Sequence, residues 1–256
     1  LVEKSVEPEP LMDVFKKMIT FQIQAENERV MGLRPSTHNY DIRYNKIKEI
    51  PKFEYSKTMK VVFASNNAHK LDEVRKILPL DIEVLSLCDV GFYQEIDETG
   101  NTLEENSRLK AQVVWDWLRS ASPSLCVDGV LADDTGLEIR ALHNAPGVYS
   151  ARWAGEPAND ANNRQKALTA LATISDRKAR FRTVITWIDE ERSFQVEGVV
   201  SGQIATQEEG HGGFGYDALF IPEGYADTFA TLPAEVKNHI SHRSRALMAL
   251  REELKK

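Results

Sequence analysis

The fold class is decided by one stretch that alternates strand, turn and helix: Lys60-Val-Val-Phe-Ala64, then Ser65-Asn-Asn-Ala-His69, then residues 70–78. The first part is short and apolar, as in a buried strand, and the second is polar, as in a turn. The third part places apolar side chains at helical spacing, at Leu71, Val74, Ile77 and Leu78. The same alternation continues toward the C-terminus, and it predicts an α/β fold.

The turn in this stretch is suited to binding an anion. A helix that starts after a strand and a polar turn points backbone N–H groups and the positive end of its dipole at the turn. Lys70 stands at this helix start, where the dipole disfavours a cation unless the cation faces a phosphate. A lysine on a solvated helix face explains the same residue, so the turn alone does not decide between the two.

The composition limits the classes of protein. The chain has 256 residues, of which 42% are hydrophobic and 28% charged, as in an ordinary soluble globular protein. No apolar stretch approaches the roughly 20 residues of a membrane span, and nothing at the start resembles a signal peptide. The net charge of −7 argues against broad nucleic-acid binding. Cys88 and Cys126 lie outside any CxxC spacing, which favours reduced thiols in the cytoplasm without a metal role.

The organisation of the chain changes near residue 58. Residues 1–58 begin with an acidic, proline-bearing stretch, and an amphipathic helix follows it, with a stripe formed by Leu11, Val14, Phe15, Met18, Ile19 and Ile23. We find no chemical motif there and predict an N-terminal extension: a partner-binding helix, the tail of a larger fused protein, or a packing element. Residues 59–256 are predicted to form one compact domain.

A pair of adjacent acids follows an apolar run in the segment Leu131-Ala-Asp-Asp-Thr-Gly-Leu137. We interpret Ser124-Leu-Cys-Val127 and Val130-Leu-Ala132 as buried extended chain that leads to it. Adjacent carboxylates repel each other, and a shared proton or a bound cation would offset that repulsion. A solvated turn is the alternative, because Asp and Gly are common turn residues.

A second acidic segment, Glu98-Thr-Gly-Asn-Thr-Leu-Glu-Glu-Asn106, opens a helix that continues to Leu118. Thr102 and Glu105 have the spacing of a capping box, which requires no function. Alternatively, Glu104 or Glu105 turns into a cleft beside the pair of acids, and such a group of carboxylates would hold Mg²⁺. The spacing does not choose between these alternatives.

A glycine-rich segment, Gly210-His-Gly-Gly-Phe-Gly-Tyr-Asp217, matches GxGxxG. We reject a dinucleotide site, because the residues that follow, Ala218-Leu-Phe-Ile221, indicate a strand rather than a helix. The glycines would let the backbone approach a flat ligand, with Phe214 and Tyr216 available for stacking. A glycine-rich surface turn is the alternative.

The last helical stretch, which begins at Pro233, concentrates positive charge at Lys237, His242, Arg243 and Arg245. Lysine and arginine are natural ligands of phosphate oxygens. A solvated basic helix face is the alternative, and it would be favoured if this segment stood alone.

Six motifs in this order resemble the inosine-triphosphate pyrophosphatase family, over about residues 59–252. They are Ala64-Ser-Asn-Asn-Ala-His-Lys70 with Glu73, Thr102-Leu-Glu-Glu-Asn106, Leu131-Ala-Asp-Asp-Thr-Gly136, Ala145-Pro-Gly-Val-Tyr-Ser-Ala-Arg152, Gly212-Gly-Phe-Gly-Tyr-Asp217 and Lys237-Asn-His-Ile-Ser-His-Arg243. The resemblance implies Mg²⁺-assisted hydrolysis of ITP, dITP and XTP to the monophosphate and pyrophosphate. It also implies an elongated, two-lobed α/β fold with a long, mixed, twisted sheet flanked by helices, a central nucleotide cleft and a homodimer.

The resemblance also implies roles for individual residues. Asp134 would be the general base and a metal contact, Glu105 the other metal carboxylate, and Asp133 a supporting one. The expected substrate contacts are Ser65, Asn66, Asn67 and Lys70 at the phosphates, Thr135 near the reacting centre, Phe214, Gly215, Tyr216 and Asp217 around the nucleotide, and Lys237, His242 and Arg243 at phosphate and base. Many relatives carry glycine where this chain has Asn66, and asparagine tolerates the left-handed backbone that glycine adopts.

Two other classes stay open. Asp134-Thr-Gly136 is also the motif of aspartic proteases, but that interpretation leaves the lysine, glycine and Ser-His-Arg motifs unused. A non-catalytic nucleotide sensor would bind ITP without turning it over, with residues 1–58 as its partner-binding arm. The charge pattern favours hydrolysis, because a triphosphate needs cations on one side and a metal held by carboxylates on the other. Selection of a 6-oxo purine needs donors aimed at O6.

Overall fold

The computed structural model describes residues 58–121 and 125–256, and these residues form the α/β fold that the sequence predicts. The amphipathic helix and linker expected in the N-terminal extension lie outside the described residues. In the part of the chain that is described, no helix combines the length and the apolar character needed to cross a membrane.

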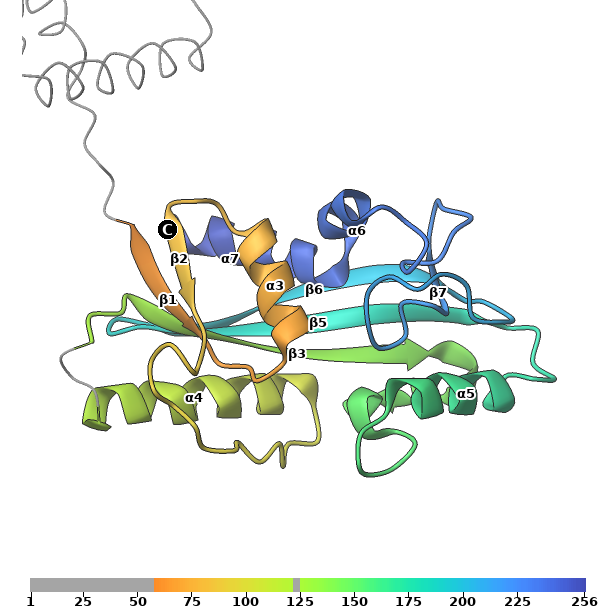
Figure 1. Ribbon diagram of the computed structural model, residues 1–256, viewed down its shortest axis with the longest axis horizontal. Helices are drawn as coiled ribbons and strands as arrows, with labels where there is room; N and C mark the ends of the chain where they lie inside the picture. Colours follow the sequence, from red (N-terminus) through yellow and green to blue (C-terminus); the bar gives the residue numbers. More distant parts are fainter. Residues whose placement is uncertain (1–57, 122–124) are drawn as a thin grey trace, which may run out of the picture. The chain divides into compact units, whose positions relative to one another are not determined.

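A seven-stranded mixed sheet has the strand order β2-β1-β3-β5-β6-β7, with β4 paired to β3. The strands are β1 (Met59–Phe63), β2 (Ile82–Leu85), β3 (Gly129–Ile139), β4 (Pro146–Gly147), β5 (Lys178–Ile188), β6 (Ser193–Ile204) and β7 (Phe220–Pro222). β1 is parallel to both of its neighbours, and the other pairs are antiparallel. Figure 1 shows β3, β5 and β6 as long twisted strands that run side by side, so the expected long mixed sheet is confirmed.

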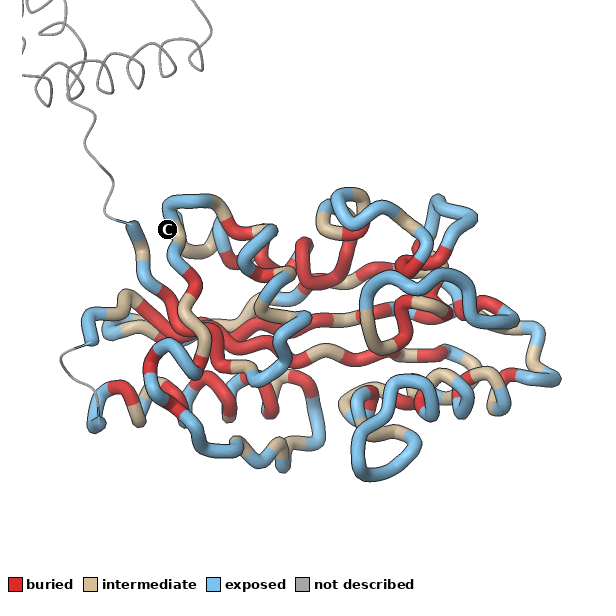
Figure 2. The backbone as a smooth tube through the Cα atoms, in the orientation of Figure 1, coloured by how far each residue is buried: buried red, intermediate tan, exposed pale blue. Residues whose placement is uncertain are grey.

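Helices cover both faces of this sheet (Figure 1). One face carries α3 (Ala68–Ile77), α6 (Ala234–Ile240) and α7 (His242–Leu254), and the other carries α4 (Leu103–Ala121) and α5 (Asp160–Ala170). Short 3₁₀ helices, η2 (Arg140–Leu142) and η3 (Ser150–Arg152), follow β3 and β4. Because both faces are covered, the middle of the sheet is buried, as the red segments of Figure 2 show.

Three hydrophobic clusters divide the core along β3. Leu131 packs toward α3 and α7, whereas Val130 and Ala132 pack toward α4. Leu137 and Ile139 belong to a third cluster, which includes residues of α5 and of the segment around β7. Neighbouring side chains of a strand point to opposite faces of the sheet, which explains the alternation. The two acids of β3 therefore lie between the clusters around Leu131 and Ala132 and the third cluster, which begins at Leu137.

The sheet leaves one edge of β3 open at the acids. β1 pairs with β3 only as far as Leu131, and β4 joins β3 only from Leu137. Among the described residues, no strand covers residues 133–136 on this side. The opening lies at the carboxyl end of β1, just before α3, which is where open α/β sheets bind their ligands.

Two interpretations of local structure are wrong. β3 continues through Asp133 and Asp134, so these acids do not form a solvated turn. Leu125 and Cys126, which were expected in buried extended chain, are exposed and lie outside any strand. The last helical stretch is two helices, because Ser241 ends α6 and its side chain accepts a hydrogen bond from Ser244 N to cap α7.

Candidate active site

A cleft of about 300 Å³ opens beside the uncovered edge of β3. Its walls are the start of α3, the middle of β3, the loop before β7, the end of α6 and the start of α7. The predicted base and every predicted substrate contact line it: Ser65, Asn66, Asn67, Lys70, Asp134, Thr135, Phe214, Gly215, Tyr216, Asp217, Lys237, His242 and Arg243. The fold thus brings together motifs that are far apart in the sequence.

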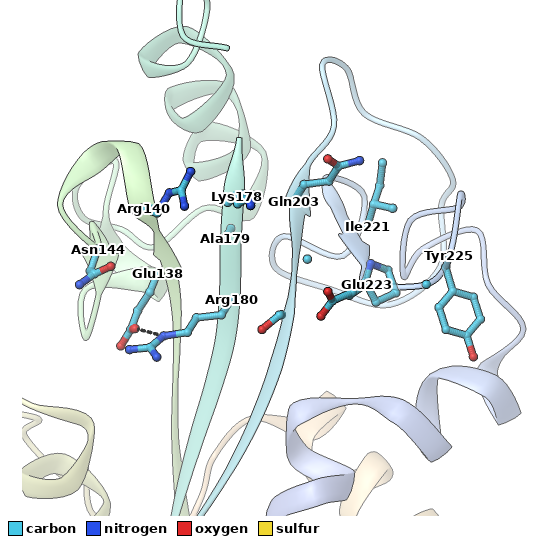
Figure 3. Close-up of a pocket in the computed structure, with 14 residues that line it drawn as sticks. Glu138, Arg140, Asn144, Lys178, Ala179, Arg180, Gln203, Ile221, Glu223 and Tyr225 are labelled. Carbon is cyan, nitrogen blue, oxygen red and sulfur yellow. Dashed lines mark hydrogen bonds and ion pairs between the residues drawn. The ribbon is translucent and has the colours of Figure 1, made fainter. Parts of the chain in front are cut away.

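A second, wider hollow of about 710 Å³ lies over the outer part of β5 and β6 (Figure 3). Arg180 Nε pairs with Glu138 Oε2 at 2.6 Å within it. The Arg180 side chain is 50% exposed, and surface ion pairs of this kind contribute little free energy. The smaller cleft, where charges are buried, is therefore the candidate active site.

The two adjacent acids point to opposite faces of β3. Asp133 contacts Lys70 of α3 and Arg243 of α7, whereas Asp134 contacts Lys110 of α4. Side-chain alternation along the strand separates the two carboxylates, so their mutual repulsion is reduced. Protein cations, rather than a shared proton, offset the charge of each acid.

Asp133 is fully buried, and cations occupy both of its oxygens. Lys70 Nζ lies 2.9 Å from Oδ1, and Arg243 Nε lies 2.9 Å from Oδ2. Burial alone would raise the pKa of Asp133, but Lys70 and Arg243 hold that pKa far below its usual value. Asp133 thus holds the two cations in position, and it does not line the cleft.

Asp134 has the properties expected of a general base. Burial raises its pKa, and Lys110, whose Nζ lies 3.1 Å from Oδ1, offsets only part of that rise. Lys110 Nζ also lies 2.6 Å from Glu98 Oε1, and these two carboxylates keep the pKa of Lys110 raised despite its burial. The ammonium thus bridges Glu98 and Asp134, so two carboxylates meet at one point of the cleft.

A second centre of charge lies at the other end of the cleft. Glu73 of α3 accepts from Lys237 Nζ at 2.7 Å through Oε1 and from Arg243 Nη1 through Oε2. Lys237 Nζ also donates to Asp217 Oδ2 at 2.6 Å. Burial would raise the pKa of Glu73, but Arg243 and Lys237 lower it, so the carboxylate stays charged. The network fixes the Lys237 and Arg243 donors inside the cleft.

An aromatic turn forms the adjoining wall. Asp217 N donates to Phe214 O at 3.1 Å, and Phe214 N donates to Asp217 Oδ2 at 2.8 Å, which closes the turn. Tyr216 is buried, and its hydroxyl donates to Ser150 O at 2.9 Å. Phe214 lies with Lys237 Nζ 5.1 Å from its ring centroid. The Phe214 ring therefore lies beside the Lys237 and Arg243 donors.

His242 and Thr135 are linked through a threonine of β5. His242 Nδ1 and Thr183 Oγ1 are 2.6 Å apart, and Thr183 Oγ1 is 2.8 Å from Thr135 Oγ1. Burial, together with Arg243 and Lys237, lowers the pKa of His242 well below its usual value, so the imidazole is neutral. A neutral imidazole accepts as well as donates hydrogen bonds.

The start of α3 forms the anion-binding end. Asn67 is the N-cap, and its Oδ1 accepts from Lys70 N at 3.1 Å. The first turn of the helix contains no acid, so nothing neutralises its positive end. Asn66 needs no left-handed backbone, since His143 and Asn144 are the only described non-glycine residues with positive φ. The loop therefore accepts asparagine without strain.

Glu105 lies elsewhere than expected. It is exposed, its N–H donates to Thr102 Oγ1 at 3.1 Å, and its carboxylate accepts from Asn101 N at 2.6 Å. Its side chain therefore caps α4, as the capping-box alternative anticipated, and does not line the cleft. Glu104 pairs with Arg182 on the other side. The carboxylate beside Asp134 comes from Glu98 instead.

The sequence interpretation missed Glu98 and Lys110 as site residues. A signal for Lys110 was present, because Lys110 and Asn106 fall on the same helical stripe as Leu103 and Val114, which are buried. A charged residue on an apolar stripe is rarely buried unless it is paired, so it indicates a partner inside the protein. Glu98 precedes the helix in an irregular segment, where no periodicity reports its direction.

Comparisons with known proteins identify the family. Residues 61–253 match the Ham1 family. The chain is 47% identical over 194 residues to a dITP/XTP pyrophosphatase from Porphyromonas gingivalis, covering 75% of this chain and 96% of that protein. It is 44% identical over 192 residues to a dITP/XTP pyrophosphatase from Flavobacterium johnsoniae, covering 75% and 96%. The solved Ham1 protein of Staphylococcus aureus is similar with a TM-score of 0.66 and 38% identity, over 77% of this chain and 98% of that one.

Proposed function

The chain belongs to the Ham1 family, and on that premise we propose that it hydrolyses ITP, dITP and XTP to the nucleoside monophosphate and pyrophosphate. One observation carries the proposal: a carboxylate with a raised pKa, Asp134, shares a cleft with a helix N-terminus and buried cations. Such a site accepts a polyanion and offers a base beside it.

We propose Mg²⁺ as the cofactor, held by Glu98 and Asp134. The two carboxylates contact the same ammonium, so their oxygens are close enough together to serve one ion. No group of three His, Cys, Asp or Glu side chains suited to a metal occurs within residues 58–121 and 125–256. The pair of Glu98 and Asp134 fits Mg²⁺, which commonly takes one or two carboxylates and completes its shell with water and phosphate oxygens. Bound there, the ion would neutralise phosphate charge and polarise phosphoryl oxygens.

The hydrolytic step follows from the positions of the residues. Asp134 accepts a proton from a water molecule, and the water oxygen bonds to the α-phosphorus. The bond from the α-phosphorus to its bridging oxygen breaks, and its electron pair leaves with pyrophosphate. Lys70 and the backbone N–H groups at the start of α3 balance the charge of the leaving group. Asp133 keeps Lys70 in place throughout.

Base selection follows from the donors at the other end of the cleft. Lys237 and Arg243 only donate hydrogen bonds, so they suit the O6 acceptor of hypoxanthine or xanthine. The 6-amino group of adenine would bring donors against donors, and such a mismatch is penalised strongly in a buried site. Phe214 offers a ring face to a purine.

Product analysis tests the proposal. The protein is incubated with Mg²⁺ and ITP, and in parallel with ATP and GTP, and the products are separated by ion-exchange chromatography. IMP and pyrophosphate from ITP, with ATP nearly untouched, are expected. IDP and orthophosphate would contradict the proposed reaction. Binding of ITP without turnover would favour the nucleotide sensor instead.

The aspartic-protease alternative loses its basis, because Asp134 faces Lys110 in a cleft that also contains Lys70, Lys237 and Arg243. We also propose a homodimer and a cytoplasmic location. The family resemblance supports the first, and the reduced thiols expected from the cysteine spacing support the second. Light scattering and cell fractionation test them.

A further inference from the structure

The aromatic turn of residues 214–217 is held by helix α5, of which Asp160 lines the cleft and Arg164 does not. Asp160 Oδ2 accepts from Gly215 N at 2.7 Å, and Arg164 Nη1 donates to Gly215 O at 2.9 Å. Residues four apart on a helix face the same side, so α5 binds both the backbone N–H and the carbonyl oxygen of Gly215. We call Asp160 and Arg164 the α5 clamp.

The clamp is itself anchored. Arg164 Nε donates to Glu208 Oε2 at 2.9 Å, which ties it to the chain that leads into the turn. Asn159 caps α5 by accepting from Asn162 N at 3.0 Å, without touching the turn. The Glu208 contact therefore holds Arg164 in position, and the clamp does not depend on the Asn159 side chain.

The turn needs such support at Gly215. This residue has a φ of +61°, and an added Cβ there would meet nothing within 4 Å. No packed side chain therefore fixes the backbone at this point, and glycine is the most flexible residue. The direction of the Phe214 ring depends on that backbone, because Gly215 follows it directly.

Phe214 also joins the turn to helix α3. Its ring stacks on His69 of α3, with centroids 5.2 Å apart and planes at 14°. Lys237 Nζ lies 5.1 Å from the same ring. A shift of the turn would change the spacing between the ring and the donors that we assign to the base, whereas Lys70 at the phosphate end is held by Asp133 rather than by the turn.

We propose that the α5 clamp positions the base-recognition wall of the cleft, acting through Gly215 on Phe214 and Asp217. This proposal rests on the function proposed above. Arg164, which does not line the cleft, is a positioning residue, and Asp160, which does, acts on the turn through Gly215 N. Replacing either residue should weaken binding of the nucleoside part of the substrate and leave binding of the phosphates unchanged.

The test compares Asp160→Ala, Asp160→Asn and Arg164→Ala with the wild-type protein. Steady-state kinetics with ITP and ATP are combined with inhibition by IMP and by pyrophosphate, the two product halves. In both alanine variants we expect KM for ITP and Ki for IMP to rise about tenfold, the effect of losing one charge-assisted hydrogen bond. Ki for pyrophosphate should stay unchanged. Asp160→Asn keeps an acceptor for Gly215 N and should restore most of the affinity.

Two controls separate positioning from general loss of structure. Asn159→Ala removes the cap of the same helix and should destabilise it without raising Ki for IMP. Gln165→Ala changes a side chain that contacts only its own helix, through Thr169.

Three results would overturn the proposal: equal weakening of IMP and pyrophosphate, unchanged IMP binding in both alanine variants, or the same change in Asn159→Ala. Absence of ITP turnover in the wild type would contradict the proposed function separately. Calorimetric titration with IMP would then still test the clamp.

Discussion

Replacing the two adjacent acids by asparagine, one at a time, should give different results: Asp133→Asn should lower stability, whereas Asp134→Asn should keep stability and lower turnover. Asparagine has nearly the shape of aspartate, so neither change opens a cavity, and charge is what differs. Asp133→Asn leaves Lys70 and Arg243 facing a neutral amide at a fully buried position. Arg243 keeps its pair with Glu73, but Lys70 loses its carboxylate partner, and removing one partner of a buried ion pair costs about 3–5 kcal/mol. At about 2–4 °C per kcal/mol, Tm should fall by roughly 6–20 °C.

Asp134→Asn should leave the free energy of unfolding within about 1 kcal/mol of the wild-type value. The pKa of Asp134 is raised in the folded state, mainly by burial, so its charged form costs stability above the pKa of the unfolded state. Asparagine removes that cost, and Lys110 keeps Glu98 as a partner. Turnover of ITP should nevertheless fall by about 100- to 10,000-fold, the usual contribution of a general base.

The dependence on pH separates the two acids further. The pKa of Asp133 is lowered in the folded state, so its stabilisation is present above the unfolded-state pKa and is lost only as the pH falls through the lower folded-state pKa. The stability gap between wild type and Asp133→Asn should therefore be constant from about pH 5 to pH 8.

Urea unfolding and thermal melts at several pH values provide the assay, with ITP turnover measured on the same preparations. Equal stability losses in the two variants would refute the placement of the acids on opposite faces. A loss below about 1 kcal/mol in Asp133→Asn would refute the buried ion pairs.

Other substitutions test the rest of the site. Glu98→Gln should raise the Mg²⁺ concentration for half-maximal rate by about tenfold or more, whereas Glu105→Gln should leave that concentration unchanged and cost only about 1 kcal/mol of stability through the helix cap. Titrations of rate against Mg²⁺ test this, and the reverse pattern would restore Glu105 as the ligand. Lys110→Met should move the acid limb of the kcat/KM profile to higher pH, because Lys110 lowers the pKa of Asp134, and a shift to lower pH would contradict that coupling. Phe214→Ala should raise KM for ITP about tenfold through lost stacking, as initial rates would show, and an unchanged KM would exclude the ring from base binding.

Local patterns in the sequence predicted much of the fold. The change from apolar run to helical spacing located β1 and α3 within one or two residues, because each pattern depends only on neighbours in the chain. The lack of helical pattern after the glycine-rich segment correctly indicated a strand, and the structure has β7 there. The basic C-terminal stretch was correctly placed as helical, but its break at Ser241 was not foreseen.

The parts of the site that depend on tertiary packing could not be predicted in the same way. Glu105 fits a helix cap and a metal site equally well in sequence, and only the direction of α4 relative to β3 decides between them. Glu73 belonged to a quoted motif, yet its role in joining Lys237 to Arg243 requires α3, α6 and α7 to meet. The placement of Asp133 and Asp134 on opposite faces of the sheet could have been predicted only by assuming that the strand continues through both residues, as β3 does.

The central claim is that a water molecule attacks the α-phosphorus with Asp134 as its base. Hydrolysis of ITP in water enriched in ¹⁸O, followed by mass spectrometry of both products, tests it most directly. The account predicts one ¹⁸O in the phosphate of IMP, none in pyrophosphate, and turnover lowered at least about 100-fold in Asp134→Asn. Label in pyrophosphate would place the attack at the β-phosphorus and contradict the account.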